Sequence, residues 1–372
     1  MGLETFTRHG TEHEKIEVEA DEIIGAMAKG IDIDIEFANI IGDMNLREIE
    51  FDTIAGNLAI RNSDIHDQVS FKGKNFSGSF NFSGSIFHED LDLTSLSVNS
   101  VNFSGASFEG DVNFKSIIFA GDAAFNISNF SGANFDGDMI FESVSFNSAA
   151  NFCASHFNGD AVFKSINFSD QANFSAANFN GDMVSESVSF SSAANFSASE
   201  FNGDAVFRLA NFGGDVNFSA AAFNGDAVFE TVNIGGLANF SASVFNGDAV
   251  FKFTNFGLGA NFSAANFRGD SVFESTNFGG ATNMSAATFD GDTSFKSANF
   301  GNSVNFSAAE FNGDADFAFS SFGGDAIFAA SKFNGETSFK TAKFAGSAIF
   351  DAAEFSEDLY ETEDYEDEDS DS

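Results

Sequence analysis

The sequence predicts an all-β solenoid in which four short faces surround a core of phenylalanine and about 22 residues form one coil. Three observations support this fold class. Phe recurs in alternating steps of six and five residues from Phe135 to Phe355, without insertion or deletion. Charged residues alternate in sign at a fixed spacing from Glu142 to Lys296, and the 372-residue chain holds 54 Phe but no Pro. A fixed period over so long a stretch is typical of repeat architectures, in which each unit contacts its neighbours.

The Phe lattice repeats after each pair of steps, one of six residues and one of five. Three positions after Phe135 hold another residue at a lattice point, namely Ser185, Ile234 and Met284. Upstream the lattice continues through Phe103, Phe125 and Phe130, with one irregular step of five residues between Phe130 and Phe135. Farther back the markers become aliphatic, down to Ile49. The register of residues 31–49 is not fixed by the sequence.

The residue that follows every fourth position of the Phe lattice indicates whether one coil contains two Phe or four. Its charge alternates in sign in the series Glu142, Lys164, Glu186, Arg208, Glu230, Lys252, Glu274 and Lys296. Opposite charges that face each other on adjacent strands are stabilising, and like charges are destabilising. The alternation therefore predicts that residues 22 apart are stacked neighbours. The Asn-Gly-Asp motif, as in Asn202-Gly203-Asp204, recurs with the same period.

Four inward Phe per coil predict four short strands. Parallel strands lie about 4.8 Å apart, so roughly 14 coils would form a rod about 65–70 Å long. Pro is excluded because each stacked backbone N–H has a partner in the next coil. Glycines at the six-residue corners, such as Gly159, Gly181 and Gly203, are expected to supply the left-handed conformation that an extra residue needs.

The repeat resembles that of the pentapeptide-repeat family, whose units read roughly A-(D/N)-(L/F)-x-x. The matching stretches include Ala172-Asn173-Phe174-Ser175-Ala176 and Ala177-Asn178-Phe179. The resemblance covers about residues 49–355 and implies a right-handed quadrilateral β-helix. This chain departs from the family pattern by adding a sixth residue to every second unit and by using Phe almost exclusively at the centre.

The sequence divides into three segments. Residues 1–30 are expected to form a mobile N-terminus and a short capping helix from Asp21 to Lys29 that stops at Gly30. Residues 31–355 form the solenoid, whose first coil needs a cap against edge-to-edge association. Residues 356–372 include ten acidic residues among seventeen and predict a disordered acidic tail. The uncapped last coil predicts a homodimer through the C-terminal coil, which some members of the resembled family form.

The formal net charge is −40, from 16 Lys and Arg against 56 Asp and Glu. One acidic residue per coil falls at the same corner and forms a candidate interaction or ion column: Asp138, Asp160, Asp182, Asp204, Asp226, Asp248, Asp270, Asp292, Asp314 and Glu336. At about 4.8 Å spacing, neighbours repel by roughly 0.9 kcal/mol at the dielectric constant of water. Molar salt screens most of this repulsion, so the composition predicts a salt-adapted, salt-dependent fold. A solvated corner is favoured over calcium sites, because each coil offers one carboxylate and no twelve-residue calcium loop exists.

This acidity argues against direct nucleic-acid binding, which needs a basic surface. The favoured function is a cytoplasmic, non-enzymatic scaffold that binds a protein partner. The family resemblance implies an alternative, a DNA mimic that binds DNA gyrase or another topoisomerase. Outside the tail, 46 acidic and 16 basic residues give one net charge per roughly 2.3 Å of rod, near the ~1.7 Å of duplex DNA. No apolar run approaches the roughly 18 residues that a membrane-spanning helix needs, and no signal peptide is recognised, so no membrane association is expected.

No catalytic, cofactor or metal site is expected. His9 and His13, beside Glu12 and Glu14, have helical spacing and form a weak candidate metal pair, but a mobile terminus is favoured. The remaining histidines, His66, His88 and His156, are interpreted as isolated residues. Cys153 lies near His156 without a base, an orienting group or a pocket, so it does not predict a nucleophile.

Overall fold

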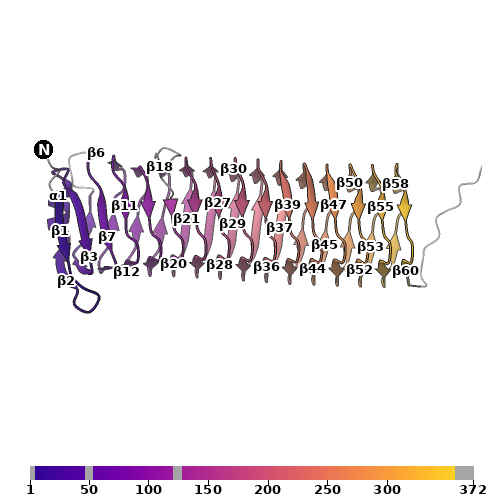
Figure 1. Cartoon of the computed structure of the whole chain (residues 1–372), viewed down its shortest axis with the longest axis horizontal. Helices are drawn as coiled ribbons and strands as arrows, with labels where there is room; N and C mark the ends of the chain where they lie inside the picture. Colours follow the sequence, from indigo (N-terminus) through magenta and orange to yellow (C-terminus); the bar gives the residue numbers. More distant parts are fainter. Residues whose placement is uncertain (1–4, 47–52, 120–127, 357–372) are drawn as a thin grey trace, which may run out of the picture.

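A computed structural model describes residues 5–46, 53–119 and 128–356, which form a straight rod of stacked β-coils (Figure 1). Four parallel sheets run along the rod, two with 16 strands and two with 14. Each complete coil contributes one strand to each sheet, so the partner of a strand is normally the strand four places further along the chain. This arrangement confirms the all-β solenoid with four faces.

One coil from the regular part shows how sequence sets the structure. Its strands are β31 (Ala194–Asn195), β32 (Glu200–Phe201), β33 (Ala205–Arg208) and β34 (Asn211–Phe212). Ala194 and Phe196 are buried while Asn195 between them is partly exposed, as the two-residue period of extended chain requires. Residues one coil apart pair with each other, for example Phe201 with Phe223. The other strands after residue 128 recur at the same places in their coils.

The core consists of columns of stacked phenylalanine rings. Phe218 is fully buried, and its ring centroid lies 4.7 Å from that of Phe196 and 4.9 Å from that of Phe240. The planes within this column differ by 7° and 8°. Rings of neighbouring columns meet edge to face, as Phe207 does with Phe218 at 5.5 Å and 81°. Edge-to-face and offset-stacked arrangements are both favourable for aromatic quadrupoles, and the ring spacing in this column matches the ~4.8 Å between paired strands.

The alternating charges lie on neighbouring strands, as the sequence predicts. Arg208 pairs in register with Glu230, and its Nε lies 3.3 Å from the Glu230 carboxylate. Lys164 and Glu186 are 3.4 Å apart, and the Lys252 Nζ lies 3.0 Å from Glu274. The predicted coil length is therefore confirmed by its register.

The number of residues per coil increases near residue 120. Phe108 pairs with Phe135 and Phe119 with Phe146, and both separations equal the 27 positions between the hydrogen-bonded Asp111 and Asp138. The five extra residues thus fall between Phe119 and Ser128, and placing the irregular step between Phe130 and Phe135 was wrong. Phe125 lies outside the described residues.

The register of residues 31–49, which the sequence leaves open, is settled up to residue 46. This stretch forms β3 (Asp32–Glu36), β4 (Ala38–Ile41) and β5 (Met44–Asn45). Each strand pairs with its counterpart in the next coil, as Ile35 does with Ile60. The solenoid therefore continues through this segment without a break in its four-strand order.

The N-terminal region corrects a second expectation, because Thr5–His9 and Ile16–Glu19 are paired in strands. Strand β1 (Thr5–His9) pairs with β3, and β2 (Ile16–Glu19) pairs with β4. The solenoid therefore begins at Thr5 and not at residue 31. The composition is misleading here because β1 and β2 bury few side chains, and only Val18 among their residues is buried. Backbone pairing, which a polar sequence can also make, holds them in place.

The short helix is confirmed as α1 (Ala20–Met27), with Asp21 and Glu22 in its first turn and Gly30 at φ +69° behind it. It takes the place of two strands in the first coil and packs against β3 and β5. Two of the four sheets consequently start one coil later. They contain 14 strands and not 16 because the last two described strands also belong to the other two sheets. The helix caps the two 14-stranded sheets, whereas the other two begin, within the described residues, with β1 and β2.

At the far end, the last described elements are β57 (Thr337–Ser338), β58 (Lys343–Phe344), β59 (Ala348–Ile349) and β60 (Glu354–Phe355). Phe350 and Phe355 stack on the preceding coil but are only partly buried. The predicted acidic tail lies almost wholly outside the described residues. Dimerisation through this coil stays a prediction.

Candidate functional site

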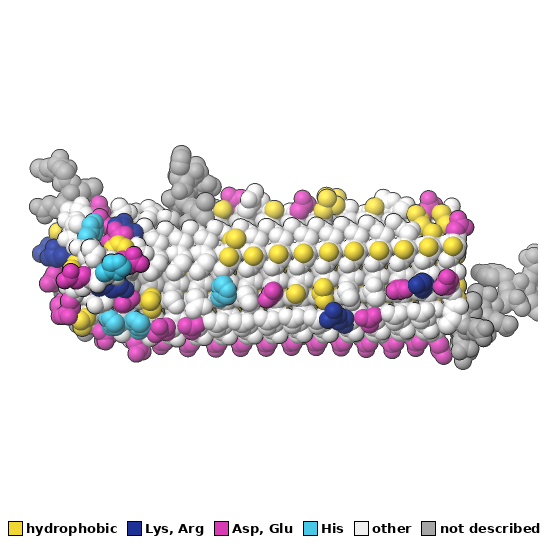
Figure 2. All heavy atoms as spheres, turned by 60° about the horizontal axis from the view of Figure 1, so that its bottom comes forward, with side chains coloured by type: hydrophobic (Ala, Val, Ile, Leu, Met, Phe, Trp, Pro, Cys, Tyr) yellow, Lys and Arg dark blue, Asp and Glu magenta, His cyan; other side chains and the backbone are white. Residues whose placement is uncertain are grey.

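The predicted acidic column lies along one corner of the rod, between the sheet that contains β32 and the sheet that contains β33. Figure 2 shows acidic side chains in an unbroken line on this edge. We call it the acidic corner, and all ten of its side chains are exposed: Asp138, Asp160, Asp182, Asp204, Asp226, Asp248, Asp270, Asp292, Asp314 and Glu336.

Each aspartate of the acidic corner is held by a hydrogen bond to the next coil. The backbone N–H of Asp226 donates to Oδ1 of Asp204 at 2.9 Å, and the N–H of Asp204 donates to Asp182 in the same way. The ladder continues to the N–H of Glu336, which donates to Asp314 at 2.8 Å. One oxygen of each carboxylate therefore satisfies a corner amide that the sheets leave unpaired, and the side chain is fixed at the pitch of the coils.

The glycine before each aspartate is required for close approach, not for a left-handed conformation. A Cβ on Gly203 would lie 2.6 Å from the carbonyl oxygen of Gly181 and 2.6 Å from Oδ1 of Asp182. Gly159, Gly181 and Gly203 do not have positive φ, so the expectation that they supply the left-handed corner was wrong. Stacking of corner on corner leaves no room for a side chain there.

The left-handed residues lie instead at the two other corners of the coil, where five residues separate the markers. They are mostly Ala and Ser, such as Ser187 at φ 56° and Ala198 at φ 55°. The coil thus uses two different corner types. The acidic corner depends on the absence of a side chain, whereas the left-handed corners accept side chains, which are mostly small but include Leu209 and Phe253.

A ladder of asparagines runs beside the acidic corner. The Asn224 side-chain amide donates to Oδ1 of Asn202 at 2.6 Å, and Arg268 donates to Asn246 at 2.8 Å. Amide side chains suit such stacking because each carries both donors and an acceptor. The acidic corner is therefore flanked by a rigid, self-satisfied polar row.

The charge of the regular coils is one-sided. Residues 128–356 contain 24 acidic and 8 basic side chains, and ten of the acidic ones form the acidic corner. Across the neighbouring strands, acids and bases alternate and form ion pairs such as Lys252 with Glu274. Most of the uncompensated charge of this region is therefore presented along a single edge.

A model of nine pentapeptide repeats matches residues 273–321 of the chain. These residues lie within the regular coils, where the inward Phe and outward Asn recur. The chain belongs to the pentapeptide-repeat family. No curated protein matches the sequence.

Two histidines of this pentapeptide-repeat protein come together, contrary to the expectation that they are isolated. The rings of His66 and His88 stack with centroids 4.9 Å apart and planes 12° from parallel. His88 Nδ1 lies 2.8 Å from Oε2 of Glu109, and Asp64 is close by. The signal was present in the sequence, because 66 and 88 differ by one coil.

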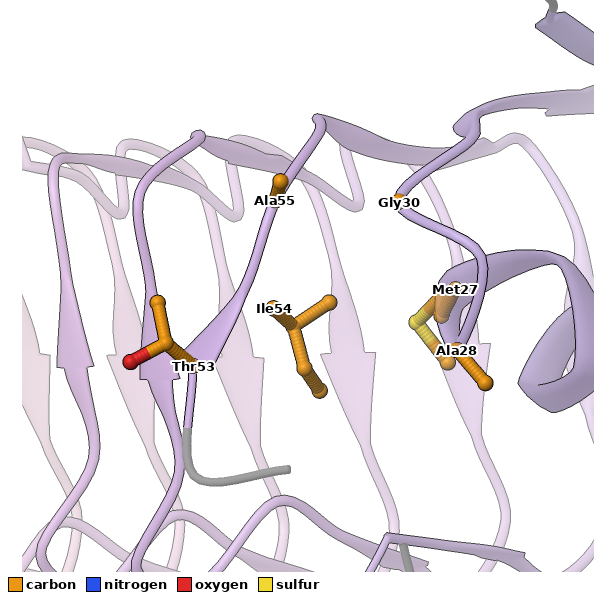
Figure 3. Close-up of a pocket in the computed structure, with 6 residues that line it drawn as sticks. All are labelled: Met27, Ala28, Gly30, Thr53, Ile54 and Ala55. Atoms are coloured by element: carbon orange, nitrogen blue, oxygen red, sulfur yellow. The ribbon is translucent and has the colours of Figure 1, made fainter. Parts of the chain in front are cut away.

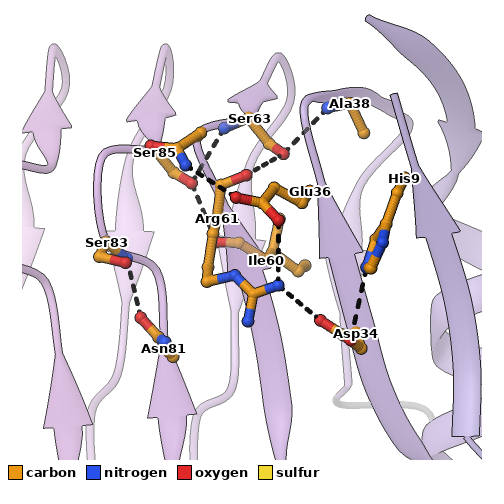
Figure 4. Close-up of polar contacts among 11 residues, drawn as sticks. His9, Asp34, Glu36, Ala38, Ile60, Arg61, Ser63, Asn81, Ser83 and Ser85 are labelled. Carbon is orange, nitrogen blue, oxygen red and sulfur yellow. Dashed lines mark hydrogen bonds and ion pairs between the residues drawn. The ribbon is translucent and has the colours of Figure 1, made fainter. Parts of the chain in front are cut away.

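The other candidate residues do not assemble. His9 ends strand β1 with Nε2 3.4 Å from Oδ2 of Asp34 (Figure 4), so the helical spacing predicted for His9 and His13 is wrong. His156 lies in β24 (His156–Phe157) with asparagines on both neighbouring strands. Cys153 is partly buried, 3.4 Å from the Ser175 hydroxyl.

A network of ion pairs marks the first coils of the pentapeptide-repeat protein. The Arg61 guanidinium at the end of β7 (Leu58–Arg61) lies 2.8 Å from Asp34 and 3.3 Å from Glu36 (Figure 4). Beside it, the Ser63 hydroxyl accepts from the Ala38 amide at 3.0 Å and donates to the Arg61 carbonyl at 2.7 Å. These contacts tie two successive coils together.

A small pocket lies where α1 meets β6 (Thr53–Ile54) (Figure 3). Its lining is aliphatic or uncharged: Met27, Ala28, Gly30, Thr53, Ile54 and Ala55. None of these lining residues is titratable, so the pocket offers no acid–base pair.

Within the described residues, no helix is long and apolar enough to cross a membrane.

Proposed function

We propose that this pentapeptide-repeat protein is a non-enzymatic scaffold that binds a basic protein surface along the acidic corner. The observation that supports the proposal is the column of ten carboxylates held in register from Asp138 to Glu336. Their hydrogen bonds to the backbone fix the row before any partner binds, which lowers the ordering cost of association. A one-signed row also attracts an oppositely charged partner over several ångströms and speeds encounter.

The pitch of the row limits the partner. Paired parallel strands lie about 4.8 Å apart, and each carboxylate accepts a hydrogen bond from the next coil, so successive carboxylates repeat at about this distance. Lys and Arg side chains are long enough to bridge two neighbouring carboxylates, and Arg can do so with two parallel hydrogen bonds. A partner segment with several Lys or Arg on one face therefore fits the acidic corner.

Mimicry of duplex DNA toward a topoisomerase such as DNA gyrase is a second candidate. A straight acidic rod favours it, because net charge per unit length outside the tail approaches that of DNA. The one-sided charge favours the scaffold, since a duplex presents phosphates on two strands around its axis.

Capture from an extract of the source organism in molar KCl tests the proposal. The bait pair is the wild type and a variant with Asp182, Asp204, Asp226, Asp248 and Asp270 changed to Asn, which keeps the acceptor oxygens. A matched control changes Glu142, Glu186, Glu230 and Glu274 to Gln on the neighbouring column. A basic partner lost only with the Asp→Asn variant supports the scaffold, and equal capture by all three baits overturns it. A topoisomerase among the lost partners, with supercoiling inhibited by the wild type alone, supports mimicry instead.

A further inference from the structure

We infer that Asp64, His66 and His88 form a site for a borderline divalent transition-metal ion such as Zn²⁺ or Co²⁺, with Glu109 orienting His88. The site lies on two adjacent coils of the N-terminal region. It is separate from the acidic corner and does not depend on the proposed scaffold function.

Strand pairing brings the three ligands together. Asp64 and Ile65 form β8, Ile86 and Phe87 form β12, and the two strands pair in register with Ile65 opposite Phe87. His66 and His88 directly follow these strands, so their side chains stack on the outer surface. Asp64 lies two residues before His66 and points to the same side of the strand.

The three residues offer a suitable donor set. One ligand atom from each of Asp64, His66 and His88 lies within 4.8 Å of the other two. Two imidazole nitrogens and a carboxylate oxygen suit Zn²⁺ and its neighbours in the first transition series, whereas Ca²⁺ and Mg²⁺ prefer oxygen ligands alone. Bonds of about 2.0–2.2 Å require the donors to move closer. His66 is exposed and His88 and Asp64 are partly exposed, so side-chain rotation can bring this about.

The contact between Glu109 and His88 is a second observation that supports the metal site. Oε2 of Glu109 lies 2.8 Å from Nδ1 of His88, which leaves Nε2 of that ring available as the metal ligand. Histidines that bind metals commonly donate their other N–H to a carboxylate, which fixes the ring and raises its basicity. Glu109 follows Phe108, which pairs with Phe87, so it is placed one coil beyond His88 by the same register. Metal ligand and orienting group thus arise from one column of the solenoid.

Lys15 competes with a metal ion for the Asp64 carboxylate. Its Nζ lies 2.6 Å from Oδ1 of Asp64, and both side chains are largely covered, at 27% and 22% exposure. A metal ion beside Asp64 would be repelled by this ammonium group. Lys15→Gln is therefore expected to tighten metal binding several-fold, an effect that a purely structural ion pair would not produce.

His156 provides the matched control. It lies on the same sheet and is also exposed, but Asn134 and Asn178 occupy the neighbouring strands. His156→Ala removes an imidazole from the same surface without touching the proposed ligands. Circular dichroism of each variant checks that the solenoid is intact.

The experiment is a Co²⁺ titration of the untagged, chelator-treated full chain in molar KCl, followed by visible absorption and by Zn²⁺ competition. We expect a Co²⁺ absorption band with the wild type and with His156→Ala. His66→Ala and His88→Ala should each lower the affinity at least tenfold, and Glu109→Gln by a smaller factor. Unchanged binding in the folded His66→Ala and His88→Ala variants would overturn the site. Equal weakening by His156→Ala would do the same, because it would indicate diffuse binding to the acidic surface.

Discussion

The coils before residue 119 and those after residue 128 share one backbone but use opposite rules for their side chains. In the later coils a column holds the same residue many times, as with Asn202, Asn224 and Asn246. In the earlier coils the same column reads Ile41, His66, His88 and Glu109. The core differs as well, because Ile, Leu and Val share it with Phe in the early coils.

The difference teaches which side chains can stack on copies of themselves. Phe rings stack favourably on Phe rings, and Asn amides form hydrogen bonds with Asn amides at the spacing of the coils. These residues can therefore recur in every coil without destabilising the fold. Stacked carboxylates repel one another. In the later coils they form a column where a backbone N–H donates a hydrogen bond to each carboxylate. The early coils place unlike residues in contact, such as Arg61 with Asp34, and there a specific site can form.

The largest expected effect comes from interrupting a Phe column in the middle of the later coils. Phe218→Asp should cost well over about 4 kcal/mol or prevent folding, because it buries an unpaired charge among stacked rings. Phe350→Asp is the matched change in the last coil, where the ring is partly buried. It should fray the end and leave the rod folded. Chemical denaturation followed by circular dichroism measures both, and a mild loss for Phe218→Asp would contradict the core assignment.

A natural break in a column offers a sharper test. Ser185 stands where Phe is otherwise found and its buried hydroxyl has no hydrogen-bond partner, while Met183 in the same strand β29 (Met183–Glu186) replaces the Ala of the neighbouring coils. Both side chains are buried on one face, so Met183 is expected to fill the space that the missing ring leaves.

A double-mutant cycle checks this compensation. Met183→Ala should cost about 2–5 kcal/mol by opening a cavity, and Ser185→Phe about 1–3 kcal/mol by overpacking. The double variant rebuilds the regular coil and should be at least as stable as the wild type. Additive losses in thermal or urea unfolding would show that the two sites are independent.

Much of the fold could be predicted because the determinants are periodic. The Phe spacing and the alternating charge of residues such as Lys164 and Glu186 fix both the coil length and the register. The N-terminal strands escaped prediction because few of their side chains are buried, and Thr5–His9 pairs through its backbone. Insertions also hide the period, as the longer step from Phe108 to Phe135 shows.

The candidate sites were predictable to different degrees. The acidic corner follows directly from the period of the coil, but its hydrogen bonds to the next coil require the geometry of the turn. The glycine conformation was misassigned because the extra residue of a six-residue corner was expected to need a positive φ, whereas Gly203 is needed for close contact with Gly181. The pairing of His66 with His88 was available from their spacing once the coil length was known.

Exchanging the two corner types should give effects of opposite sign. Gly203→Ala places a methyl group against the Gly181 carbonyl and the Asp182 carboxylate and should cost about 1–3 kcal/mol. Ala198→Gly relieves a left-handed residue at φ 55°. After the entropy cost of glycine, it should be neutral or stabilising by up to about 1 kcal/mol. Thermal unfolding of the two variants measures the signs, and a loss with Ala198→Gly as large as that with Gly203→Ala would contradict the distinction.

Salt should act on the two regions in opposite directions. Asp204→Asn keeps the acceptor for the Asp226 amide and removes a charge between two like neighbours, so it should stabilise by about 1 kcal/mol at low ionic strength. In ~1 M KCl the gain should disappear, because the screening length falls to about 3 Å. Arg61→Ala should cost most at low salt, where Asp34 and Glu36 lose an unscreened partner.

Hydrogen exchange of the wild type at low and molar KCl reports both regions at once. Protection of the later coils should rise with salt and that of the ion-paired early coils should fall. A fully folded rod in low-salt, chelator-treated buffer with no gain on adding KCl would contradict salt adaptation.

The smallest expected effect concerns the alternating column of the later coils. Lys252→Glu would stack three acids, with Glu230 and Glu274 on either side, and would replace a 3.0 Å ion pair by repulsion. Exposed pairs contribute little, so the loss should exceed that of Lys252→Ala by about 0.5–1 kcal/mol at low salt. In molar KCl the two variants should unfold at the same temperature. Equal losses at low salt would mean that these side chains do not interact across the coils, even though their strands lie side by side.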